Sequence, residues 1–159
     1  MVYLSLGSNL GDREKYLAQA REALMAEFDW VRFSWVYETE PVDLREQPWF
    51  LNQVVELKTD WTPESLLEWV QQLEKKLGRQ RDVPKGPRTL DVDILLFDDV
   101  VREDPGLTIP HPRLTERRHV LVPLRDLASD LVLPHGGYSV RKALAEVKDH
   151  SQVKLYEQS

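Results

Sequence analysis

The strongest chemical signal in the sequence is a pair of carboxylates, Asp91 and Asp93, in the run Leu90-Asp91-Val92-Asp93-Ile94. Residues i and i+2 of a β-strand point to the same face, so we expect both carboxylates on one face and the aliphatic side chains on the other. Two adjacent like charges destabilise a half-buried strand unless a cation lies between them. Mg²⁺ is commonly held by one or two carboxylates together with substrate phosphates. The spacing therefore favours a metal site over two solvated carboxylates on an exposed edge strand.

Basic residues gather just before this pair and indicate an anionic ligand. The stretch from Lys75 to Arg88 has a single interior acid, Asp82, among six basic residues: Lys75, Lys76, Arg79, Arg81, Lys85 and Arg88. Arginines beside metal-binding carboxylates suit phosphoryl-type transfer, because they stabilise charge that develops on the transferred group. The alternative is a solvated, charged helix end. Walker A and GxGxxG sequences are absent, so any nucleotide must be bound in another way.

Two further patterns could contribute to a site. His111 lies between Pro110 and Pro112, where a neutral imidazole could hydrogen-bond a phosphate or move a proton. Phe50 and Asn52 are spaced to share a strand face, where the ring could stack on a flat heterocycle and the carboxamide could bind its edge. A structural loop histidine, and a core aromatic beside an asparagine at the sheet edge, remain the alternatives.

The elements that must position these residues alternate between strands and helices. Periodicity and capping signals predict strands over 2–6, 31–37, 50–57 and 90–97, a helix from Asp12 to about Phe28, and a helix from the Thr62 cap to Leu77, with Gly78 as its stop. The order β-α-β-β-α-β indicates an α+β, ferredoxin-like fold, with helices packed on an antiparallel sheet. Residues 38–48 and 80–89 are expected to be loops. Residues 98–159 add a C-terminal elaboration with short helices near 124–128 and 140–147, and with no linker or repeat we expect a single domain over 1–159.

Composition excludes several classes of protein. The chain has 159 residues, of which 42% are hydrophobic and 30% charged, and these values are typical of a globular protein. It contains no cysteine, which excludes disulfides, thiolate metal sites and cysteine nucleophiles. The net charge of −6 argues against broad nucleic-acid binding. Neither a signal peptide nor an apolar run of roughly 18 residues is present, so a cytoplasmic protein that binds no membrane is expected.

Several motifs together resemble a known family. They are LGSNLG at 6–11, YET at 37–39, QPxFLN at 47–52, GPRTLDVDI at 86–94 and IPH at 109–111. In order and spacing, over about residues 1–135, these are similar to the 6-hydroxymethyl-7,8-dihydropterin pyrophosphokinases of folate biosynthesis. The resemblance implies an enzyme that transfers pyrophosphate from ATP to the hydroxymethyl group of a dihydropterin and releases AMP. It also implies a ferredoxin-like fold and two Mg²⁺ ions, and we expect a monomer.

The resemblance also implies a role for individual residues. The metal ligands would be Asp91 and Asp93, and the catalytic residues would be these two with Arg79, Arg81 and Arg88. ATP would be bound by Gln71, Glu74, Arg79, Arg81, Arg88, Ile94, Thr108, His111 and Arg117. The pterin pocket would contain Thr39, Val42, Phe50, Asn52, Asp91 and His119. Aromatic residues often stand in the family where this chain has Lys85, Pro112 and His119.

Two other classes share the predicted topology. An RNA-binding domain would place stacking aromatics on its central strands. The first strand offers only Tyr3, and the carboxylate pair would repel RNA phosphates unless a metal is bound. A small-molecule regulatory domain would need no carboxylate pair beside an arginine-rich loop. RNA binding with and without Mg²⁺, and ATP turnover, discriminate among the three.

Overall fold

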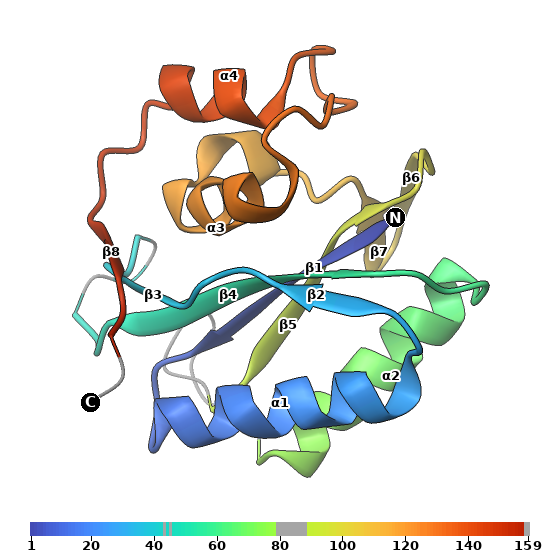
Figure 1. The fold of residues 1–159 in the computed structure, drawn as a ribbon, viewed down its shortest axis with the longest axis vertical. Coiled ribbons are helices and arrows are strands. Elements are labelled where there is room, and N and C mark those ends of the chain that lie inside the picture. The colour runs from blue at the N-terminus through green and yellow to red at the C-terminus, as the bar shows by residue number, and fades with distance from the viewer. Residues whose placement is uncertain (43, 45, 79–88, 158–159) are drawn as a thin grey trace.

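The computed structural model describes residues 1–42, 44, 46–78 and 89–157, in which helices cover both faces of one sheet (Figure 1). On one face lie α1 (Arg13–Glu27) and α2 (Pro63–Lys76), and on the other lie α3 (Arg118–Ala128) and α4 (Val140–Glu146). The strands are β1 (Val2–Ser8), β2 (Val31–Phe33), β3 (Tyr37–Thr39), β4 (Phe50–Leu57), β5 (Asp91–Phe97), β6 (Arg102–Asp104), β7 (Leu107–Ile109) and β8 (Val153–Leu155); a 3₁₀ turn spans Leu114–Glu116. Among the described residues, no helix is long and apolar enough to cross a membrane.

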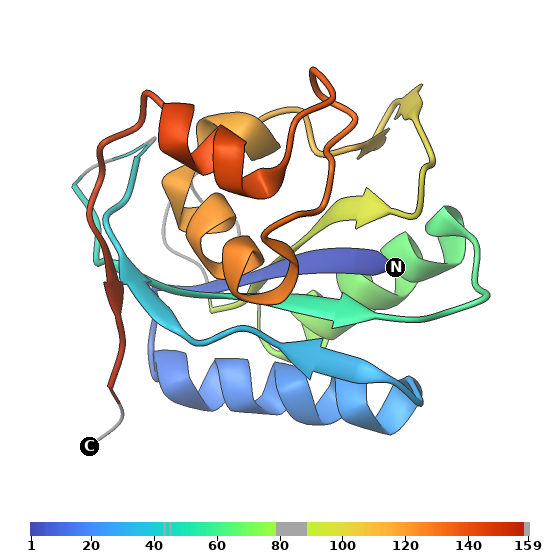
Figure 2. The same cartoon turned by 45° about the horizontal axis from the view of Figure 1, so that its top comes forward.

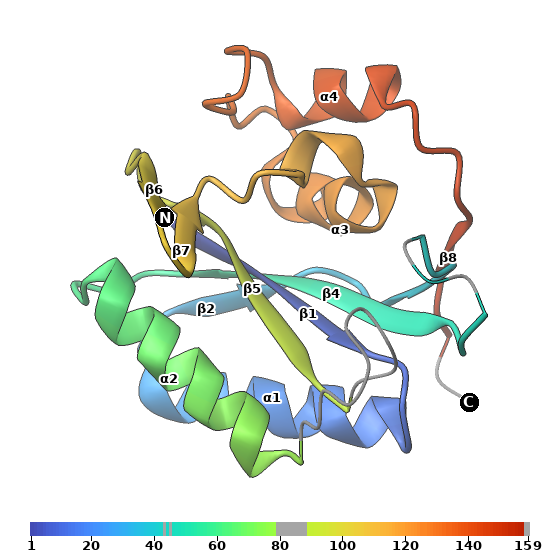
Figure 3. The same ribbon diagram turned by 180° about the vertical axis from the view of Figure 1, so that it is seen from behind.

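The sheet is antiparallel in every described pairing. Its strand order is β5-β1-β4-β3-β8, and β2 also pairs with β4. β6 and β7 form a separate hairpin that contacts the end of β5 (Figure 3). These pairings confirm the predicted combination of helices with an antiparallel sheet.

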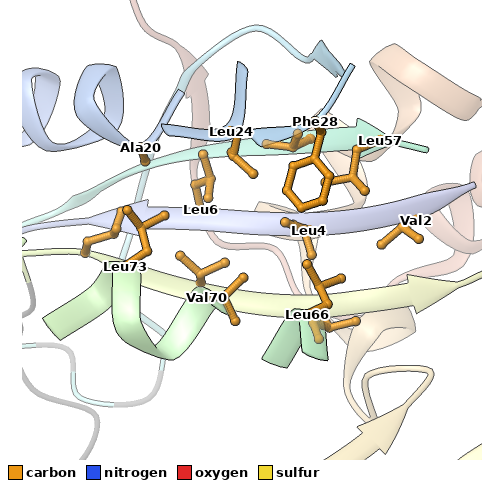
Figure 4. Packing of buried hydrophobic residues seen from close by; sticks show 14 of the residues in the cluster. Val2, Leu4, Leu6, Ala20, Leu24, Phe28, Leu57, Leu66, Val70 and Leu73 are labelled. Atoms are coloured by element: carbon orange, nitrogen blue, oxygen red, sulfur yellow. The ribbon is translucent and has the colours of Figure 1, made fainter. Parts of the chain in front are cut away.

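The main core lies between the sheet and the first two helices. Leu4 and Leu6 of β1 point toward α1 and α2, where they pack among Leu24, Leu66 and Val70 (Figure 4). Alternation along β1 places the polar or small residues Ser5 and Gly7 on the opposite face. The apolar residues of β1 thus attach the sheet to α1 and α2. The small and polar residues of the same strand lie on the opposite face, where a functional site can form.

The helix signals read from the sequence are confirmed. The Asp12 side chain accepts a hydrogen bond of 3.2 Å from the backbone N–H of Lys15, as an N-cap does. Thr62 accepts one of 3.1 Å from the N–H of Ser65, and Pro63 is the first residue of α2. Gly78 follows that helix with a φ of +82°, a conformation that glycine adopts without strain.

The predicted strand over 31–37 is wrong as a single element. It is divided into β2 and β3 because Ser34 alters the pairing with β4. The N–H of Ser34 donates to the carbonyl of Val54 at 2.9 Å, while the Ser34 hydroxyl, in place of a backbone carbonyl, accepts from the N–H of Val54 at 2.9 Å. Trp35 consequently turns outward and is 71% exposed.

The helix predicted near 124–128 begins earlier, at Arg118, and contains Pro123. Proline inside a helix removes one backbone hydrogen bond, so Pro123 by itself disfavours the longer helix. Burial of Val120, Leu121 and Leu124 against the sheet favours the longer helix despite Pro123. The helix predicted near 140–147 is confirmed as α4.

The second face of the sheet is covered over only part of its length. Under α3 it forms a second core, in which Tyr3, Val54 and Leu95 pack against Leu121 and Leu124. Tyr3 is 4% exposed and donates a hydrogen bond to Glu56, so it is not available to stack on an RNA base. Beyond the end of this core, the same face carries polar and small residues that line a pocket.

Candidate active site

One pocket brings together residues from five separate parts of the chain. It encloses about 670 Å³, a volume that includes its open mouth, between the sheet, the loop after β3, the segment after β7 and the start of α3. Its lining residues are Ser5, Gly7, Thr39, Glu40, Pro41, Val42, Gln47, Phe50, Asn52, Asp91, Asp93, Leu95, His111, Arg117, His119 and Val120. Nine of these residues were predicted from the sequence as site residues.

The carboxylate pair lies along one side of the pocket. Asp91 and Asp93 are half-buried on β5, opposite Gly7 and Ser5 of β1 in the strand register. Val92 and Ile94, which alternate with them, are buried in the main core with residues of α2, which confirms that the carboxylates and these aliphatic side chains lie on different faces of the strand. The described residues contain no group of three or more metal-ligating side chains. Two carboxylates suit Mg²⁺ only when phosphate oxygens and water complete its oxygen shell.

The opposite end of the pocket is built around Asn52. Its side chain is buried, its Oδ1 accepts a hydrogen bond from the Thr39 hydroxyl, and its Nδ2 lies 3.4 Å from the carbonyl oxygen of Leu6. Phe50 lies two residues before it on the same face. A Cβ atom on Gly7 would come within 2.8 Å of Asn52 Nδ2, so this amide can approach β1 as closely as it does because Gly7 has no side chain.

His111 faces the pocket as a neutral imidazole. Its backbone N–H donates to the carbonyl of Leu95 at 2.9 Å, which ties the segment after β7 to the edge of β5. Its Nδ1 accepts from the N–H of Arg113 at 3.3 Å, so the ring proton of the neutral form is on Nε2. Burial, together with the positive charge of Arg117, lowers the pKa of His111 to about 4 despite the opposing effect of Asp91. The site thus offers an uncharged N–H donor at neutral pH.

The loop that closes the Asn52 end is fixed at its far side by the start of α1. Asn9 Nδ2 donates to Gln47 Oε1 and to the carbonyl of Pro48, both at 2.9 Å. Arg13 forms an ion pair of 2.7 Å with Glu38 and donates to the carbonyl of Trp49 at 3.0 Å. The GSN motif therefore has a structural consequence: it connects β1 to the wall of the pocket.

Comparison with known proteins identifies the family. The sequence profile of 7,8-dihydro-6-hydroxymethylpterin-pyrophosphokinase (HPPK) matches residues 3–129. The chain belongs to this family. It is 47% identical to the 2-amino-4-hydroxy-6-hydroxymethyldihydropteridine pyrophosphokinase of Bacillus subtilis over 133 residues, which cover 82% of this chain and 80% of that protein. The family predicted from the sequence is confirmed, and the names of these relatives describe the predicted class of reaction, the transfer of pyrophosphate to a hydroxymethyldihydropterin.

Other relatives are longer than this chain. The folic acid synthesis protein fol1 of Pneumocystis carinii is 41% identical over 150 residues, which cover 94% of this chain and 20% of that protein. A crystal structure of a Plasmodium falciparum HPPK-DHPS superimposes with a TM-score of 0.69 at 15% identity, and the match covers 91% of this chain and 45% of that one. The chain thus spans about a fifth of one relative and just under half of the other, and the structural likeness supports the fold.

Four residues expected around the nucleoside of ATP lie outside this pocket. They lie on three elements, of which α2 and β7 both contact β5 (Figure 3): Gln71 and Glu74 on α2, Ile94 on β5 and Thr108 on β7. Ile94 is in the core, and Glu74 is buried, with its Oε2 accepting a 2.9 Å hydrogen bond from the N–H of Val92. Glu74 therefore satisfies a backbone donor on an edge strand. Arg79, Arg81 and Arg88, and the position of Lys85, lie outside the described residues.

Sequence reasoning missed seven pocket residues: Ser5, Gly7, Glu40, Pro41, Gln47, Leu95 and Val120. For two of them, Ser5 and Gly7, the sequence contained a pattern that could have predicted their position. Ser5 and Gly7 alternate with Leu4 and Leu6, so the face opposite the core carries small side chains. Such a face leaves room for a ligand or for the side chain of a neighbouring strand.

Proposed function

We propose that the pocket is where this HPPK family member binds the dihydropterin and presents its hydroxymethyl group to ATP. One observation carries the proposal. The buried amide end at Asn52 and the carboxylate pair on β5 open into the same pocket, although Asn52 and Asp91 are 39 positions apart in the sequence. A flat heterocycle and a metal-bound phosphate need these two environments side by side.

The pterin ring would occupy the Asn52 end. Asn52 and Thr39 provide hydrogen-bonding groups for the ring edge, and Phe50 provides an aromatic face. Val42 and His119 line the same pocket and would enclose the ring. A concave pocket with a few convergent polar groups is typical of a small-molecule site.

Asp91 and Asp93 would hold magnesium between the two substrates, and we expect two ions. When bound, Mg²⁺ would neutralise phosphate charge and orient the oxygens of the transferred group. The pair fits this role because its members share one strand face and both reach the pocket. Asp91 would also contribute to the pterin end, since it lies across β1 from Asn52, with Gly7 between them in the register.

ATP would extend from the pocket to the outer edge of β5. His111 Nε2–H and Arg117, which line the pocket, would bind phosphate oxygens, and Ile94, Thr108, Gln71 and Glu74 would surround the nucleoside. Arg79, Arg81 and Arg88, predicted from the sequence, would bind the triphosphate of ATP with their positive charges. In the reaction, the hydroxymethyl oxygen bonds to the β-phosphorus while the bond from that phosphorus to the α–β bridging oxygen breaks. The hydroxyl proton is released, AMP departs, and positioned cations stabilise the transition state.

We also propose that the chain has a ferredoxin-like fold. The order β5-β1-β4-β3, with α1 and α2 on one face, supports a ferredoxin-like βαββαβ core. We propose that residues 98–157 elaborate this core within one pyrophosphokinase domain. The chain would act as a cytoplasmic monomer that binds neither nucleic acid nor membrane, and light scattering tests the monomer.

The decisive experiment separates pyrophosphoryl transfer from phosphoryl transfer. The protein is incubated with ATP, Mg²⁺ and 6-hydroxymethyl-7,8-dihydropterin, and the nucleotides are separated by chromatography. AMP and pterin diphosphate should form in equal amounts, and only when the pterin is present. An Asn52→Ala variant should bind the pterin about 5–150-fold more weakly, since an unpaired buried polar group costs about 1–3 kcal/mol, and should bind MgATP nearly unchanged. Formation of ADP, or equal weakening of both ligands, would contradict the proposal.

A further inference from the structure

The C-terminal segment lies beyond the part of the chain that matches the family profile, which ends at residue 129. It nevertheless runs along one edge of the sheet (Figure 2), where β8 pairs with β3 and Val153 lies opposite Thr39, a residue that lines the pocket. Two residues of this segment, Asp149 and Gln152, are three positions apart and make hydrogen bonds to two different walls of the pocket. Neither has a role in the reaction described above.

The first wall is the start of α3. The N-cap position of this helix is occupied by Arg117, whose guanidinium has only donors and cannot accept a hydrogen bond from the helix N–H groups. Asp149 supplies the missing acceptor from 31 residues farther along the chain: its Oδ2 accepts from the N–H of Arg118 at 3.1 Å. The Arg118 side chain in turn donates to the carbonyl of Ser151 at 3.2 Å. A carboxylate here also interacts favourably with the positive end of the helix dipole.

The residues held by this contact belong to the site. Arg117 and His119, on either side of Arg118, both line the pocket. Burial by itself would raise the pKa of Asp149. Hydrogen bonds from Ser151 and Arg118, together with the nearby His119, lower it instead, so the charged cap is favoured.

The second wall is the loop that follows β3. The N–H of Glu40 donates to the carbonyl of Gln152 at 3.0 Å, and the N–H of Gln152 donates to Glu40 Oε1 at 3.1 Å. Glu40, Pro41 and Val42 line the pocket on this side. The same short segment therefore fixes the start of the loop and the start of α3.

We propose that residues 149–152 form a clasp that positions the two walls of the pocket for pyrophosphoryl transfer, with Asp149 as its principal positioning residue. The inference rests on the proposed function, because the walls matter only if substrates bind between them. The clasp does not contact the reacting atoms. It acts by restricting the positions of Arg117, His119 and Glu40 before the substrates arrive, and such restriction lowers the cost of binding and orientation.

The test compares three variants of the whole chain. Asp149→Ala removes the acceptor at α3, whereas Asp149→Asn keeps an oxygen that can accept from Arg118. Ser139→Ala is the matched control, because the Ser139 hydroxyl caps α4 through a 3.1 Å hydrogen bond from the N–H of Lys142 and neither residue lines the pocket. The two alanine variants each lose one helix cap of similar kind.

Asp149→Ala should lower kcat/KM for pyrophosphoryl transfer about tenfold, and Asp149→Asn should restore it to within about threefold of wild type. Ser139→Ala should lower the midpoint of thermal unfolding by a similar amount but change kcat/KM less than about twofold. Hydrogen exchange of the ligand-free protein provides a readout that does not depend on activity: the backbone amides at 118–120 should exchange faster only in Asp149→Ala.

The outcomes separate this inference from the proposed function. An inactive wild-type chain would refute the proposed function, whatever hydrogen exchange showed at Asp149. An active wild type with unchanged kcat/KM in Asp149→Ala would overturn the clasp, as would an equal loss in Ser139→Ala. A second pair tests the other wall: Gln152→Pro removes the N–H that binds Glu40 and should weaken pterin binding several-fold, whereas Gln152→Ala keeps both backbone bonds and should not.

Discussion

Gly7 is the position at which a single added methyl group should most directly disturb the proposed pterin pocket. It lies opposite Asn52 in the pairing of β1 with β4. A Cβ atom built on Gly7 would be 2.8 Å from Asn52 Nδ2, well inside ordinary van der Waals contact, which begins near 3.4 Å. The Gly7→Ala variant therefore forces the amide to move, by about 0.6 Å if ordinary contact is to be restored.

The size of the effect follows from the contacts that hold the amide. Asn52 accepts from Thr39 and lies at 3.4 Å from the carbonyl of Leu6, which is already a long hydrogen bond. Displacement of a buried amide costs roughly one hydrogen bond and misaligns the other, or about 1–2 kcal/mol. If Asn52 binds the ring edge, pterin affinity should fall about 5–30-fold, and MgATP affinity should change less than about twofold.

A double-mutant cycle isolates the cause. Affinities for the pterin and for MgATP are measured by calorimetry in wild type, Gly7→Ala, Asn52→Ala and the double variant. Once the Asn52 amide is absent, the nearest remaining atom is Phe50 Cδ1 at 3.6 Å, an ordinary contact. The cost of Gly7→Ala should then shrink to within about 0.5 kcal/mol. An equal cost in both backgrounds would refute the reasoning, because the methyl group would then act through something other than Asn52.

Three further predictions follow from the site and its supports. Asp91→Asn and Asp93→Asn should each lower turnover at least about 100-fold without changing the circular dichroism spectrum, and near wild-type turnover at limiting Mg²⁺ would contradict the metal assignment. Glu74→Ala leaves the N–H of Val92 without this acceptor and should cost about 1–3 kcal/mol in urea denaturation, most of it restored in Glu74→Gln; equal losses would show that the hydrogen bond is not the cause. Because the pKa of His111 is lowered from 6.5 to about 4, the unfolded chain takes up a proton near pH 6.5 that the folded chain does not. Folded stability should therefore fall as the pH drops from 6.5 toward 4, and His111→Gln should lose less than wild type between pH 7 and pH 5 when both are unfolded in urea.

Much of the fold could be predicted from the sequence because its causes are local. Asp12 and Thr62 satisfy the first N–H groups of their own helices, and Gly78 adopts its own positive φ. The period of two in Asp91-Val92-Asp93 determines which side chains share a face, whatever the strand packs against. The five motifs that together predicted the family, among them those at 47–52 and 86–94, could be recognised for the same reason: each is contiguous in sequence.

The tertiary structure determined which residues from distant parts of the sequence contact one another. The hydroxyl of Ser34, opposite Val54, divides a strand that the pattern predicted as continuous. The role of Gly7 cannot be read from the sequence, because it depends on the pairing of β1 with β4, which places Gly7 opposite Asn52. Asp149 is an ordinary charged residue in the sequence, yet it caps a helix that begins 31 residues earlier. Such contacts depend on register and on distances between distant segments, and these are determined by the packing of the whole sheet against its helices rather than by any local preference.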